Sequence, residues 1–161
     1  MVDMPDLERQ EKLTRLLLFF LSSQIRHNTL KTALANRALL EQDRLVADIY
    51  WIIENVRITS FIKDAFPGVF RDWEDIVKYL LNRRPGPQHT NKAEWRIEEF
   101  LKESLNSTFT GVPASSGPED SLRMAQAIKE SWQDAGVPLK RYRGMVPFTP
   151  WGKLIPGRIK E

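Results

Sequence analysis

The sequence predicts an all-α protein, a single helical bundle of five or six helices followed by an extended, irregular C-terminal arm. Two contrasting stretches carry this prediction. Residues 30–57 contain neither glycine nor proline, and their apolar residues recur at three, four and seven positions, which places them on one face of a helix. Residues 137–161 hold four prolines and three glycines, so neither a helix nor a central strand can persist there. We therefore divide the chain into a helical domain, residues 1–136, and a C-terminal arm rich in proline, aromatic and basic residues, residues 137–161.

The expected helices follow from caps and breakers. Residues 6–26 form a first helix that Asp6 can cap, and we expect it to lie antiparallel to a central core helix over 30–57, whose apolar surface widens near Trp51. On the first helix we expect a buried stripe that Leu18, Leu21 and Ile25 broaden; the stripe itself is Leu13, Leu16, Leu17 and Phe20. A short helix capped by Ser60 follows and ends at Pro67. Further helices are expected over residues 70–82, 91–105 and 118–135.

Two of these later helices have clear start signals. Asn91 is followed three residues later by Glu94, a capping-box arrangement, and Pro118 suits the first position of the last helix. Between them, residues 83–89 contain two prolines and a glycine and must interrupt any helix.

Composition narrows the class of protein. With 161 residues, 42% hydrophobic and 28% charged, the chain matches one ordinary globular domain. It has no cysteine, which removes disulfides, thiolate zinc sites and cysteine nucleophiles. The apolar run at 16–21 is too short to span a bilayer, and the mixed N-terminus does not resemble a signal peptide. We expect a soluble, intracellular protein without a membrane span.

The arm is the strongest candidate for function, because its apolar residues are too numerous to be left in water. We expect five of them to anchor a protein partner or a second copy of the chain: Tyr142, Met145, Phe148, Trp151 and Leu154. The alternative is that the arm wraps its own domain and closes the core. The leading hypothesis is a non-enzymatic interaction or assembly protein.

Nucleic-acid binding is the second hypothesis. Basic residues alternate with aromatic ones in the arm, a combination that suits phosphates and stacked bases. The arm carries a net charge of +5, so residues 1–136 are net negative by two within the total of +3. The basic residues are Lys140, Arg141, Arg143, Lys153, Arg158 and Lys160.

Arg84 and His89 have an R-x4-H spacing that resembles the active-site motif of helical HEPN-type ribonucleases. Arg83 also fits an R-x5-H spacing, so the resemblance covers seven residues; it implies metal-independent RNA cleavage by the arginine and the histidine. In this chain two prolines and a glycine lie between them and interrupt the helical setting.

Other chemistries have little support. The two histidines, His27 and His89, lie in no metal-binding motif, and there is no G-x-S-x-G or phosphate-binding loop. We expect no catalytic residue, no metal site and no cofactor.

Overall fold

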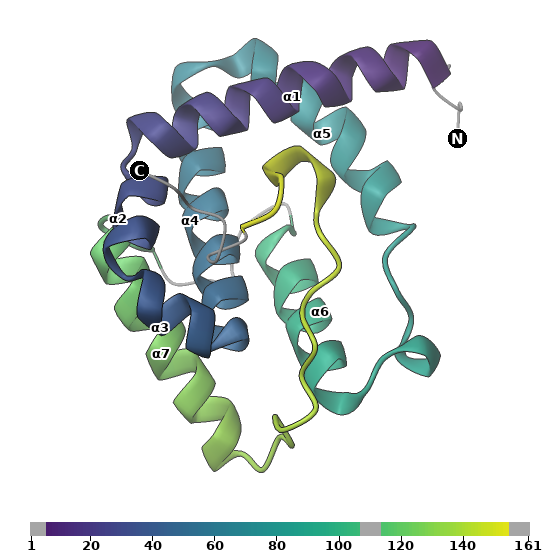
Figure 1. Cartoon of the computed structure of the whole chain (residues 1–161). Helices are drawn as coiled ribbons and strands as arrows, with labels where there is room; N and C mark the ends of the chain where they lie inside the picture. The colour runs from purple at the N-terminus through teal and green to yellow at the C-terminus, as the bar shows by residue number, and fades with distance from the viewer. Residues whose placement is uncertain (1–5, 107–113, 155–161) are drawn as a thin grey trace.

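The computed structural model describes residues 6–106 and 114–154, and it confirms the all-α class: these ranges contain helices and no strand (Figure 1). The α-helices are α1 (Asp6–Arg26), α2 (Thr29–Ala35), α3 (Arg37–Gln42), α4 (Arg44–Ala65), α5 (Pro67–Leu81), α6 (Lys92–Ser104) and α7 (Pro118–Asp134). Two short 3-10 helices are η1 (Pro87–His89) and η2 (Thr149–Trp151). The described residues thus form seven α-helices rather than the expected five or six.

The prediction of one continuous helix over residues 30–57 is wrong, because the structure interrupts it at two positions. At the first break, the Thr32 carbonyl accepts from the Asn36 side chain at 2.9 Å as well as from the Asn36 N–H at 3.1 Å, and Asn36 leaves the helical conformation with φ −113° and ψ 26°. At the second break, the Asp43 carboxylate accepts the Val46 N–H at 3.1 Å and caps α4. No new cap forms at Ser60, so α4 continues to Ala65 and ends before Pro67.

The core is built around α4. Residues 45–56 of this helix are buried without interruption, so neighbours cover it on every side. It packs against α1, α3, α5, α6 and α7. Figure 1 shows α1 lying across the end of α4, so the expected antiparallel hairpin of these two helices does not form. No helix in the described ranges is long and apolar enough to cross a membrane.

After α7, Gly136 adopts a positive φ of 81°, and the chain leaves the helix there. The described part of the arm, residues 137–154, then runs along α6 towards α1, where η2 packs against α1 (Figure 1). The remaining residues of the arm, 155–161, lie outside the described ranges.

Candidate functional site

The structure places the five predicted anchors of the arm inside the chain's own core or at its edge. Met145, Phe148, Trp151 and Leu154 are buried, and Tyr142 is half-buried. This is the alternative in which the arm closes its own domain. In this arrangement the five side chains leave little surface for a partner.

An aromatic cluster holds the far end of the arm. The Trp151 ring stacks on Trp73 of α5 with centroids 6.0 Å apart, and Phe148 meets Trp151 edge-on at 4.8 Å. Phe20 of α1 contacts Trp73 at 5.3 Å and Trp151 at 6.4 Å. Aromatic pairs in these geometries stabilise beyond the apolar area that they bury, so α1, α5 and the arm share one core.

Asp48 of α4 forms hydrogen bonds with the middle of the arm. Its carboxylate accepts hydrogen bonds from the Tyr142 hydroxyl and, at 3.0 Å, from the Met145 N–H, and it lies 3.3 Å from the Arg44 guanidinium. Burial raises the pKa of Asp48, while Arg44 and the two hydrogen bonds oppose the rise. Burial and the neighbouring Asp48 charge also raise the pKa of Tyr142 above its ordinary value, so its hydroxyl remains a donor.

Arg84 is a second residue of the helical domain that binds the arm. Its guanidinium pairs with Glu98 of α6 and donates to the Val146 and Pro147 carbonyls at 2.6 and 2.9 Å. The side chains of Arg84 and Glu98 are only 5% and 2% exposed. Arg84, the arginine of the R-x4-H spacing, is therefore engaged with a carboxylate and two carbonyls, and His89 belongs to η1 rather than to an α-helix.

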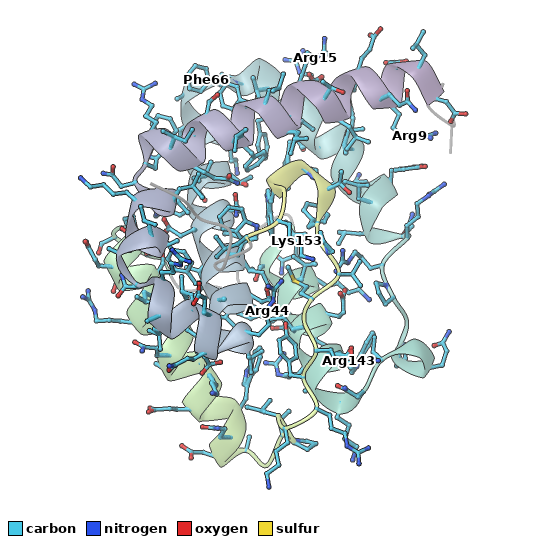
Figure 2. The ribbon with its side chains drawn as sticks, in the orientation of Figure 1. Arg9, Arg15, Arg44, Phe66, Arg143 and Lys153 are labelled. Carbon is cyan, nitrogen blue, oxygen red and sulfur yellow. The ribbon has the colours of Figure 1, made fainter. Side chains whose placement is uncertain are left out.

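Of the basic residues in the described part of the arm, Arg143 forms an ion pair and the other three do not. Arg143, labelled beside the arm in Figure 2, pairs with Glu94 of α6 at 3.0 Å. Lys140, Arg141 and Lys153 are exposed, and Arg158 and Lys160 lie outside the described residues.

A buried polar network around Glu54 of α4 involves no arm residue. The Glu54 carboxylate accepts from Thr29 at 2.8 Å, from Ser121 at 2.6 Å and from Arg57 at 2.8 Å. Three donors satisfy this fully buried charge, so we interpret the network as structural. Among the described residues, no group of three or more acidic or histidine side chains is arranged to hold a metal ion.

The surface that sequence reasoning missed is the outer face of α1. Five of the eight large apolar side chains that the described residues expose lie on this helix. We define the outer face by these five: Leu7 (71% exposed), Leu17 (38%), Leu18 (59%), Leu21 (47%) and Ile25 (62%). The sequence contains the signal, because positions 18, 21 and 25 form a three-and-four stripe opposite the buried Leu16, Phe20 and Ser23. We expected Leu18, Leu21 and Ile25 to broaden the buried stripe, and that expectation is wrong.

A groove borders this face. It has a volume of about 390 Å³ between α1 and α5, and Leu18, Phe19 and Val69 form much of its apolar wall. Phe66 is 38% exposed and packs edge-on against Phe19 at 5.1 Å, which extends the apolar surface beyond α1 (Figure 2).

Charge is graded along the outer face of α1. Glu8 and Glu11 are exposed near the amino end of the helix, and Arg26 is exposed at its carboxyl end. Lys31 adds an exposed positive charge just beyond it, in α2. The amino end of the face is therefore acidic and its carboxyl end basic, although Glu8 lies 3.5 Å from Lys12 and the exposed Arg15 lies 3.4 Å from Asp72 of α5.

No protein-family model, curated protein or solved structure matches this chain.

Proposed function

We propose that this chain is a non-enzymatic assembly protein that pairs with a second copy of itself through the outer face of α1. The observation that carries the proposal is the concentration of exposed apolar side chains on one helix whose opposite side is already buried. Soluble monomers rarely expose a contiguous apolar surface of this kind, and such surfaces commonly mark interfaces.

The charge gradient supports a second copy as the occupant. In an antiparallel pair of α1 helices, Glu8 and Glu11 of one copy approach Arg26 of the other, and the exchange occurs twice about a two-fold axis. A parallel pair would place like charges together. The face is thus complementary to itself in one orientation.

The apolar middle supports the same orientation. Leu18 and Leu21 lie near the centre of the face, so an antiparallel pair brings these residues of both copies together. The groove beside Leu18 can receive an apolar side chain from the other copy. A helix of 21 residues spans about 31 Å, which gives a contact of useful length.

The test is sedimentation equilibrium of the full chain across micromolar concentrations. We expect a reversible dimer that Leu21→Asp weakens by about tenfold or more, because a charge then lies in the apolar centre of the contact. Val146→Asp is the matched control, since Val146 is 51% exposed but belongs to the arm. A monomer at every concentration, or equal loss in both variants, contradicts the proposal.

Charge reversal tests the orientation. Glu8→Lys with Glu11→Lys should weaken the dimer, and adding Arg26→Glu with Lys31→Glu to the same chain should restore it. Failure of the second pair to restore association would exclude the antiparallel arrangement.

A further inference from the structure

A second concave site lies at the other end of the molecule, where the arm leaves α7. This junction cavity has a volume of about 730 Å³, within the range of small-molecule sites. Figure 1 shows that the start of the arm is far from α1, so the cavity is separate from the proposed dimer surface. Its lining residues are Asn91, Lys92, Gln133, Val137, Pro138, Leu139, Lys140 and Arg141.

All the charged side chains that line the junction cavity are positive. It contains the cations Lys92, Lys140 and Arg141 and no carboxylate. None of these three cations forms an ion pair with a described residue. Nearby cations behave differently: Lys129 pairs with Asp43, and Arg143 pairs with Glu94. The junction cavity therefore gathers the positive charge that the fold leaves uncompensated in this region.

The backbone around the cavity adds to its preference for anions. Lys92 begins α6, a helix of 13 residues, and the amino end of a helix carries partial positive charge. The side chain of Asn91 fixes both walls: its oxygen accepts the Glu94 N–H at 2.9 Å, and its nitrogen donates to the Arg141 carbonyl at 2.8 Å. The arm and α6 are thus joined at the cavity rather than free to separate.

The remaining wall is apolar. Val137 and Leu139 are half-buried and pack against the hydrophobic core, with Pro138 between them. A simple inorganic anion would leave this wall in water, whereas an anion that carries an apolar group would cover it.

From these features we infer that the junction cavity binds a small organic anion, a phosphate or carboxylate attached to an aromatic or aliphatic body. Lys140, Arg141 and Lys92 bind the anionic group, and Val137, Pro138 and Leu139 contact the apolar body. The cavity is an open depression lined by the start of the arm, the amino end of α6 and Gln133 of α7, and Lys153 is at the opposite end of the described arm. A compact ligand fits this geometry better than a nucleic-acid strand, which would need a continuous basic track.

The test is a titration of the isotope-labelled full chain with 1-naphthyl phosphate, followed by amide NMR shifts. We expect saturable shifts at Gln133, Val137, Leu139 and Arg141, with inorganic phosphate and 1-naphthol each binding more weakly. Lys140→Gln with Arg141→Gln should weaken binding by about tenfold, as expected for the loss of two exposed cation contacts. Lys63→Gln with Lys153→Gln removes the same charge at exposed sites elsewhere and should leave the affinity unchanged.

Three results would overturn the inference. Shifts confined to the groove beside Leu18 would place the ligand at another site. Equal affinity for inorganic phosphate would remove the role of the apolar wall. Binding of a single-stranded oligonucleotide through Lys140 and Arg141, without binding of naphthyl phosphate, would replace the small anion with nucleic acid.

Discussion

The arm and α1 both cover the core from outside, but they treat their apolar residues in opposite ways. The arm turns Phe148 and Trp151 inward until each is 1% exposed. α1 turns Leu16 and Phe20 inward as well, yet it keeps Leu18 and Ile25 at 59% and 62% exposure. An irregular segment can bend so that its large apolar side chains reach the core, as those of the arm do apart from Val146, whereas a straight helix with apolar residues on two sides must leave one side outward. Burial of the arm therefore contributes stability, while the outer face of α1 is the surface through which we propose that two copies pair.

The largest expected effect comes from truncating one apolar side chain to alanine in each of the two regions. Trp151→Ala should lower the free energy of unfolding by about 4 kcal/mol, because it removes a fully buried ring and leaves a cavity. Leu21→Ala, on the outer face of α1, should change it by no more than about 0.5 kcal/mol. Urea denaturation monitored by circular dichroism measures both. A loss below about 1 kcal/mol for Trp151→Ala would mean that the arm is not part of the core.

The second effect compares two ion pairs of the arm region. Arg84→Met should lower the free energy of unfolding by about 3 kcal/mol. The substitution leaves the buried Glu98 carboxylate without its partner and two arm carbonyls without their donor. Arg143→Met should cost less than about 1 kcal/mol, since the Arg143 side chain is 75% exposed and water screens its pair with Glu94. The same urea denaturation measures both variants. Similar losses of unfolding free energy would show that the difference in burial does not determine how much each ion pair contributes to stability.

The sequence predicted the all-α class because helical periodicity and proline breaks are local signals. It also indicated the residues of the arm that need burial, but it left open whether the chain or a partner buries them. That choice depends on contacts across long separations, such as Trp73 with Trp151 and Asp48 with Met145. No spacing rule encodes such contacts.

Two other features could not be predicted for different reasons. The breaks at Asn36 and Asp43 depend on side chains that bond to the backbone, and the apolar periodicity passes across them. The outer face of α1 was misjudged because an exposed leucine and a buried leucine on neighbouring stripes look alike until the position of the core is known.

A smaller effect is the dependence of stability on pH, which should have opposite signs for a titrating group beside the arm and for one at the end of α1. Burial raises the pKa of Asp48, the carboxylate that holds the arm, from its ordinary value of 3.8. The folded state then binds the proton more tightly than the unfolded state, so this contribution to stability is present below pH 3.8 and is lost as pH rises through the folded pKa. Relative to Asp48→Asn, the native chain should lose stability as pH increases above about 4.

His27, at the junction of α1 and α2, should behave in the reverse sense. Burial, with Arg57 and Arg26 nearby, lowers the pKa of His27 from 6.5. The unfolded state then binds the proton more tightly, so stability present above pH 6.5 is lost as pH falls through the folded pKa. Relative to His27→Gln, the native chain should therefore lose stability on acidification below pH 6.5. Thermal melts of the three proteins from pH 4 to pH 8 measure both slopes, and slopes of the same sign would contradict this part of the comparison.

The smallest effect on the folded chain concerns the outer face itself. Leu18→Gln and Val146→Gln both replace exposed apolar side chains, so each should change the unfolding free energy of the monomer by no more than about 0.5 kcal/mol. They should differ in how the melting temperature depends on protein concentration. Association stabilises the folded state by mass action, so the melting temperature of the native chain and of Val146→Gln should rise with concentration. In Leu18→Gln that rise should be largely lost, because the substitution places a polar amide at the centre of the proposed contact. If all three proteins melt independently of concentration, α1 exposes its leucines without a second copy to cover them, and the contrast with the arm is one of burial alone.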